Sequence, residues 1–193
     1  MTKPFLSGPT VGLYGLTRDD LQIYRSWIEN PEATHFMESG WRPQSDAEME
    51  AIYKASTEPT DTAVFKIIPH GSDKPIGVVG LYLIQWICRR GEFRVLIGDD
   101  RARGKGYGTE AARLLVDYAF DKVNLETLYL GVNTENTGAV RSYEKAGFQR
   151  EGIRRKLVYR NSRYYDVVMM SIIREEWLAA RAAGAKTVAG KAK

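Results

Sequence analysis

The chain has 193 residues, of which 44% are hydrophobic and 27% are charged, and its formal net charge is +4. These proportions are those of an ordinary globular protein and exclude a disordered chain, a collagen and a coiled-coil rod. The lone cysteine, Cys88, and only two histidines exclude an intramolecular disulfide and a Cys/His metal cluster, so we expect no metal.

The positive charge is concentrated at the end of the chain, where residues 184–193 carry three lysines and no acid. We expect a single domain over 1–183, followed by a flexible basic tail over 184–193. Such a tail is weak support for nucleic-acid binding, so a basic nucleic-acid-binding domain is a less favoured alternative. No apolar run is long enough for a signal peptide or a spanning helix, which predicts a soluble, cytosolic protein with no membrane contact.

The first half of the chain predicts short strands and amphipathic helices. A strand is expected at 11–16, and Thr17 with the acids after it looks like the start of a capped helix. Ser45 and Glu48 have the spacing of a capping box, which opens a second helix through about residue 56. Further strands are expected at 63–68, 74–85 and 92–97.

The second half alternates strands and helices. A charged loop with glycines, 98–105, leads into a helix whose apolar residues recur at helical spacing from Ala111 to Ala119. Gly147 is the expected left-handed cap of a later short helix. The remaining elements are expected as a strand at 127–132, that helix at 135–146, hairpin strands at 148–159 and 164–173, and a last helix at 174–183. This order predicts a mixed α/β fold, with helices on the faces of a mixed sheet.

The loop before the long helix has glycines at alternate positions. It consists of Arg103, Gly104, Lys105, Gly106, Tyr107, Gly108 and Thr109. Glycines allow a close backbone approach, and the helix that follows offers free N–H groups and a positive dipole end, so the segment predicts an anion site. The spacing fits neither the Walker pattern nor GxGxxG, because Thr109 stands where the last glycine would fall. A plain tight turn is the alternative.

A tyrosine stands on the short helix at 135–146. Ala139, Tyr143 and Ala146 share one helical face, so Tyr143 points inward or into a cleft. From the spacing alone, a core tyrosine with a satisfied hydroxyl is the alternative to a functional one.

Together these two segments resemble the GNAT superfamily of acetyl-CoA-dependent N-acetyltransferases. The likeness rests on Arg103-x-x-Gly106-x-Gly108 at a strand-to-helix turn, followed by Asn136 and the run from Tyr143 to Phe148. It is closest to the branch of ribosomal-protein alanine and spermidine/spermine acetyltransferases. The resemblance implies a GNAT-like fold with a central, mostly antiparallel twisted sheet, acetyl-CoA as co-substrate and, by analogy, a homodimer.

The resemblance also implies which residues hold the coenzyme. Val95, Leu96 and Ile97 would lie on a strand that splays from its neighbour, with their backbone pairing with the pantetheine arm. The loop from Arg103 to Thr109 would wrap the pyrophosphate. Contacts at the pantetheine side and the nucleotide end would come from Asn136, Arg141 and Lys145.

Tyr143 would lie near the thioester sulfur and protonate the leaving thiolate, while a backbone N–H of Val95 or Leu96 polarises the carbonyl. Because an amine of pKa ~10.4 is almost fully protonated at neutral pH, a base is useful, and Glu92 is the candidate. Its alternative role is an ion pair with Arg89, Arg90 or Arg94. Direct transfer needs no acyl-enzyme, so Cys88 is not required.

The acceptor is expected to be a primary amine on a polyamine, a protein N-terminus, an amino sugar or an aminoglycoside. Acids over 27–50 suit a cationic amine, although an ordinary solvated helical face explains them equally well. Cations near the final hairpin would repel a polyamine and suit an acidic acceptor; they are Arg154, Arg155, Lys156, Arg160 and Arg163. A non-catalytic acyl-CoA sensor on the same scaffold is the alternative function.

Overall fold

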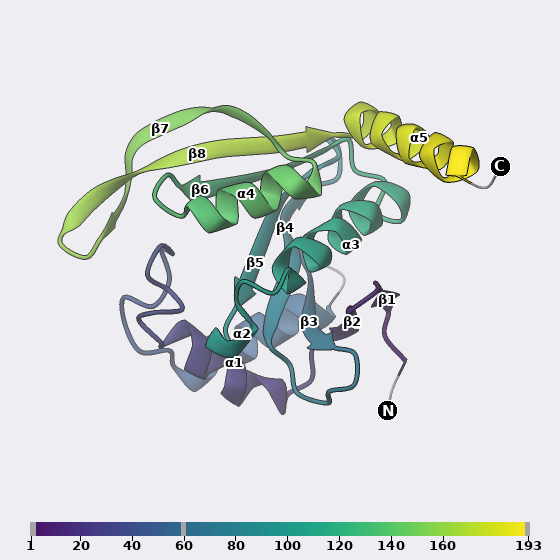
Figure 1. Ribbon diagram of the computed structural model, residues 1–193. Helices are drawn as coiled ribbons and strands as arrows, with labels where there is room; N and C mark the ends of the chain where they lie inside the picture. Colours follow the sequence, from purple (N-terminus) through teal and green to yellow (C-terminus); the bar gives the residue numbers. More distant parts are fainter. Residues whose placement is uncertain (1–2, 59–60, 192–193) are drawn as a thin grey trace.

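The computed structural model describes residues 3–58 and 61–191, and its strands form one eight-stranded sheet (Figure 1). The strands lie in the order β1-β2-β3-β4-β5-β6-β8-β7. Each neighbouring pair is antiparallel except β5 and β6, which are parallel. The strands are β1 (Leu6–Ser7), β2 (Val11–Gly15), β3 (Ala63–Pro69), β4 (Gly77–Gln85), β5 (Arg90–Ile97), β6 (Thr127–Asn133), β7 (Gln149–Arg160) and β8 (Arg163–Ile173). This sheet confirms the expected mixed, mostly antiparallel α/β architecture.

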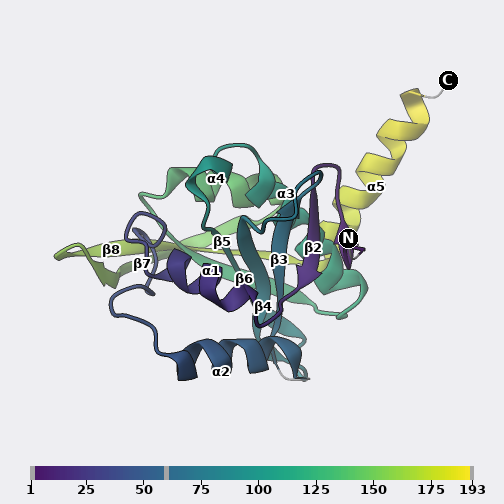
Figure 2. The same cartoon turned by 90° about the horizontal axis from the view of Figure 1, so that it is seen from below.

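Helices cover both faces of the sheet. Figure 2 shows α1 and α2 on one face and α3 and α4 on the other. The helices are α1 (Asp20–Ile28), α2 (Asp46–Thr57), α3 (Tyr107–Asp121), α4 (Thr137–Ala146) and α5 (Arg174–Lys191), with a short 3₁₀ turn at Asp100–Ala102. The two faces therefore carry separate hydrophobic cores.

The larger core lies under α3. Ala111, Leu115 and Ala119 are completely buried there, as the helical spacing predicts. They share one cluster with Phe93 of β5 and Leu128 of β6. The smaller core, under α1 and α2, consists of Leu16, Trp27, Ile28, Val64, Val78 and Leu96. Because α3 packs against β2, β4 and β5, it fixes the position of the loop that precedes it.

The start of α1 differs from the sequence prediction. The helix begins at Asp20 rather than at Thr17, and Thr17 does not cap it. Instead the backbone N–H and the hydroxyl of Thr17 both donate to the Asp20 carboxylate at 2.7 Å, and the Lys66 ammonium donates to it at 2.7 and 3.0 Å. Burial acts to raise the pKa of Asp20, but the hydrogen bonds from Lys66 and Thr17 outweigh it, so the pKa is lowered.

We expect Lys66→Met to lower the free energy of unfolding by about 3 kcal/mol, because it leaves a buried carboxylate without its cation. The side chains of Lys66 and Asp20 are only 16% and 11% exposed. A carboxylate whose pKa is lowered by folding stabilises the protein above its unfolded pKa of ~3.9 and loses that effect as the pH falls. In urea titrations the difference between the proteins should therefore shrink below about pH 4. Lys122→Met, in an exposed pair with Asp121, is the control and should change stability by less than about 1 kcal/mol; an equal loss in both variants would contradict the role of the buried pair.

The last helix is longer than predicted. α5 runs from Arg174 to Lys191, past residue 183 where the sequence places its end. The expected tail over 184–193 partly coincides with this helix, and 192–193 lie outside the described residues, so the tail's flexibility and the domain boundary stay predictions. Within the described residues no helix is long and apolar enough to cross a membrane, and the cytosolic location stays a prediction.

Candidate active site

A gap opens in the centre of the sheet between β5 and β6. The two strands pair at Arg90 with Thr127, Gly91 with Leu128 and Glu92 with Tyr129, and the pairing then stops. β5 continues to Ile97 and β6 to Asn133 while each stays bonded to its outer neighbour, β4 or β8, and Figure 1 shows the two strands diverging. Val95, Leu96 and Ile97 therefore lie beside this gap with no strand partner on the β6 side.

The glycine-containing loop lies at the end of β5, where the gap is open. Gly104 and Gly106 have φ of +73° and +86°, a region that favours glycine, and Gly106 is the residue before α3. A Cβ at either position would meet no atom within 4 Å, so the loop presents bare backbone to open space. The first N–H groups of α3 have no partner within the helix and lie in this backbone. The segment is thus suited to an anion.

Arg103 does not extend freely from this loop. Its guanidinium pairs with Asp100 at 2.8 Å and donates to the Ile97 carbonyl at 3.2 Å. Lys105 is exposed, and Gly108 approaches Ile97, so that a Cβ there would lie 3.4 Å from the Ile97 side chain. The start of α3 is therefore held against the end of β5.

Two contacts fix α4 against α3. Thr109 and Ser142 share a hydroxyl hydrogen bond of 2.7 Å, and Arg113 donates to the Lys145 carbonyl at 2.9 Å. At the start of α4, Asn136 accepts from the N–H of Ala139 at 3.1 Å. The side chains of Arg141 and Lys145 are exposed on the outer surface of α4. The structure thus brings the loop and α4 together, with Tyr143 between them and the sheet.

Tyr143 packs on the sheet beside the gap. Its ring lies edge-on to Phe93 of β5, with centroids 5.7 Å apart, and 6.0 Å from Phe148. Gly147 ends α4 at φ +105°, as the sequence predicts, and turns the chain so that Phe148 reaches that ring. Among the described residues the Tyr143 hydroxyl has no hydrogen-bond partner, and burial raises its pKa to about 12. It is therefore a protonated phenol with a free donor.

Glu92 approaches the gap from the other face of the sheet. It alternates with Phe93 along β5, so its side chain lies on the α1 and α2 face while Tyr143 lies on the α3 and α4 face. Both Glu92 oxygens accept from Arg94, from Nε at 2.7 Å and Nη2 at 3.0 Å. Of the possible arginine partners, Arg94 is the one the structure selects, because Arg89 and Arg90 bond elsewhere.

Asn133 is a candidate binding residue that the sequence analysis missed. It stands at the end of β6 across the gap and is only 4% exposed. Its side-chain oxygen accepts the N–H of Glu135 at 2.9 Å, but its amide nitrogen is buried without a partner among the described residues. Native proteins rarely leave such a donor unpaired, which points to a ligand or water. An asparagine three residues before Asn136 was the only signal in the sequence.

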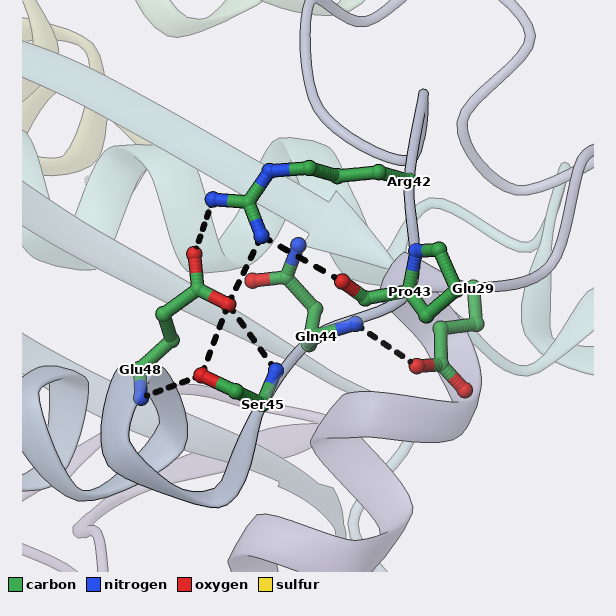
Figure 3. A network of polar contacts seen from close by, with 6 residues as sticks. All are labelled: Glu29, Arg42, Pro43, Gln44, Ser45 and Glu48. Carbon is green, nitrogen blue, oxygen red and sulfur yellow. Dashed lines mark hydrogen bonds and ion pairs between the residues drawn. The ribbon is translucent and has the colours of Figure 1, made fainter.

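Three of the six acids over 27–50 are paired with arginines. Figure 3 shows Arg42 donating to Glu48, which also accepts from the backbone N–H and hydroxyl of Ser45 in the predicted capping box. The Arg42 hydrogen bond, with those from Ser45, lowers the pKa of Glu48 to about 2. Two further pairs join Arg25 to Asp46 and Arg18 to Glu50. These three carboxylates each have an arginine beside them, whereas Glu29, Glu32 and Glu38 form no ion pair among the described residues.

The five cations of the final hairpin fall into two groups, those with partners in the protein and those exposed to solvent. Arg160 donates to the Thr34 hydroxyl at 3.2 Å and to the Gly40 carbonyl at 3.1 Å, which ties the α1–α2 connection to the hairpin. Arg163 pairs with Glu135. The other three, Arg154, Arg155 and Lys156, lie exposed where β7 bulges away from β8.

Comparisons with known proteins agree with this geometry. The model of the acetyltransferase (GNAT) domain matches residues 11–149. Spermidine N(1)-acetyltransferase of Escherichia coli K12 is 30% identical over 183 residues, which cover 90% of this chain and 91% of that protein. The Vibrio cholerae enzyme of the same name is 32% identical over 168 residues, 86% of this chain and 94% of that one.

The solved structures give the same assignment. A Vibrio cholerae spermidine N-acetyltransferase in complex with CoA and spermine matches with a TM-score of 0.80 and 30% identity, covering 89% of this chain and 99% of that one. The family and the fold expected from the sequence are thereby confirmed. The chain belongs to the GNAT family of acetyltransferases and is an N-acetyltransferase whose acetyl donor is acetyl-CoA.

Proposed function

We propose that the chain transfers an acetyl group directly from acetyl-CoA to a primary amine of a small molecule, at the gap between β5 and β6. The observation that carries this proposal is the end of β5–β6 pairing at Glu92 and Tyr129, with the glycine-containing loop at the open end and Tyr143 beside the gap. Acetyl-CoA supplies the thioester, and the residues around the gap bind, orient and exchange protons.

Several features of the gap fit the binding of acetyl-CoA. The backbone at Val95, Leu96 and Ile97 has no pairing with β6, although the Ile97 carbonyl accepts from Arg103, and its groups on that side can pair with the amides of the pantetheine arm. The buried Asn133 amide can donate to a carbonyl of the same arm. The backbone from Arg103 to Thr109 would hold the pyrophosphate. Asn136 would contact the pantetheine side, with Arg141 or Lys145 at the nucleotide end.

Proton transfer is assigned to two residues on opposite faces. The Tyr143 hydroxyl, which its raised pKa keeps protonated at neutral pH, donates a hydrogen bond to the leaving sulfur as negative charge develops there. Glu92 attracts the acceptor ammonium and takes its proton, directly or through water, with one of the oxygens that it shares with Arg94. A backbone N–H of Val95 or Leu96 polarises the carbonyl.

Spermidine and spermine head the acceptors to be tested, because the similar enzymes are named for spermidine and one was solved with spermine. A homodimer is also proposed. Its support is β7, an edge strand of the sheet that exposes Ile153, Leu157 and Tyr159.

The experiment is a thiol-release assay with acetyl-CoA against polyamines, amino acids, peptides, amino sugars and aminoglycosides. We expect acceptor-dependent release of CoA with at least one small primary amine. Tight acetyl-CoA binding in calorimetry without release for any amine would support the alternative, a non-catalytic acyl-CoA sensor, and would contradict the proposal.

A further inference from the structure

Arg94 is the positive group nearest to the proposed base. It stands two residues after Glu92 on β5, so both side chains lie on the face covered by α1 and α2. The Arg94 side chain is 53% exposed and that of Glu92 is 22% exposed. An amine approaching Glu92 from this face therefore meets an accessible guanidinium beside it.

The Tyr82 ring supports the Arg94 guanidinium on one of its flat faces. The guanidinium stacks on this ring with its central carbon 4.8 Å from the centroid, and Tyr24 lies beside Tyr82 and influences the pKa of its hydroxyl. Gly80 pairs with Arg94 across the strands, and a Cβ there would meet the Tyr82 ring at 2.9 Å. Glycine at 80 thus makes room for the ring on which Arg94 lies.

One edge of this guanidinium is free. Arg94 uses Nε and one nitrogen of its fork on Glu92, which leaves the remaining N–H donors without a partner among the described residues. Glu38 acts on Arg94 electrostatically but forms no hydrogen bond to it. A planar fork with a free edge matches a carboxylate, which it binds with two parallel hydrogen bonds.

The neighbouring charges do not favour a simple polycation. Glu48, Asp46 and Glu50 are each paired with an arginine of the chain, which weakens their attraction for the extra ammonium groups of a polycation. Glu38 and Glu92 are negative and Arg94 is positive, so this face offers charges of both signs to an acceptor.

We infer that Arg94 binds a carboxylate of the acceptor, so that this enzyme prefers a small aminocarboxylate, such as an amino acid, over the bare amine. The acceptor ammonium lies toward Glu92 and its carboxylate takes the free edge of Arg94. This inference rests on the proposed function and specifies its acceptor.

The test compares acceptors that differ only in the carboxylate: ornithine with putrescine, and lysine with cadaverine, with spermidine as a further amine. We expect kcat/KM to be at least about tenfold higher for the amino acid of each pair. Arg94→Gln also removes the partner of Glu92, so activity with both members of a pair can change, but KM should rise more for the amino acid and the ratio of kcat/KM within each pair should fall to about one. Arg94→Lys should restore part of the preference, because it returns the charge without the fork.

Arg90→Gln is the matched control, since Arg90 is an exposed arginine on the same strand whose guanidinium bonds Gln85; it should keep the preference. Equal kcat/KM within both pairs, or an equal loss for both members in Arg94→Gln, would overturn the inference while spermidine acetylation leaves the proposed function intact. If none of the amines tested causes thiol release, both the inference and the proposed function are overturned.

Discussion

Replacing Tyr143 by phenylalanine is expected to lower kcat by about one to three orders of magnitude with little change in acetyl-CoA affinity. The hydroxyl has no partner within the described residues, so its loss leaves no unpaired group and the ring contacts with Phe93 and Phe148 remain. The phenol's pKa of about 12 lies ~3.5 units above that of a thiol, so it acts best by donating a hydrogen bond as negative charge develops on sulfur. Steady-state thiol release and calorimetry with CoA measure the two effects.

Tyr118→Phe is the matched control for this experiment. Tyr118 also packs on the larger core, burial raises its pKa, and its ring lies edge-on to Phe5, just before β1, and to Phe65 of β3. Tyr118→Phe should have a melting temperature similar to that of Tyr143→Phe and the kcat of the unchanged enzyme. Unchanged kcat in Tyr143→Phe would remove Tyr143 from the chemistry and leave it a core residue.

Gly106→Val is expected to weaken acetyl-CoA binding by about 10- to 100-fold. Gly106 precedes α3 at φ +86° and borders open space. A β-branched residue is strained in that conformation, so the loop must shift, and its side chain would also occupy the path of the phosphates. Calorimetry with CoA measures the loss of affinity directly.

Gly71→Val separates strain from binding. Gly71 has φ +81° and equally open surroundings, but it lies in the turn between β3 and β4 rather than in the loop before α3. Both variants should lose similar stability, and only Gly106→Val should lose affinity. Normal binding in Gly106→Val would refute the assignment of this loop to the pyrophosphate.

The sequence predicted the elements around the gap because local rules decide them. The stripe from Ala111 to Ala119, the capping box at Ser45 and the left-handed Gly147 each depend on residues close in the chain. Thr17 was misjudged because a distant residue, Lys66, holds Asp20 and makes that carboxylate the acceptor. Local spacing gives no account of that contact.

In the candidate site, too, local motifs could be predicted from the sequence and contacts between distant residues could not. The glycine loop and Tyr143 could be named from motifs, whereas the partners of the acids could not. Arg42, six residues before Glu48, and Arg18, thirty-two before Glu50, meet them only in the folded chain. The partner of Glu92 was open among three arginines, although strand alternation favours Arg94, which shares its face. Asn133 escaped notice because an unpaired amide is visible only once its surroundings are known.

The early separation of β5 from β6 has a consequence for folding as well as catalysis. Part of the central sheet has no main-chain pairing between β5 and β6. A ligand whose amides pair with these strands would complete the hydrogen bonding of the sheet there. Anything that binds only the folded form adds to its stability by mass action. The fraction of the enzyme that is folded, and hence its resistance to proteolysis in a cell, should therefore increase with the concentration of acetyl-CoA.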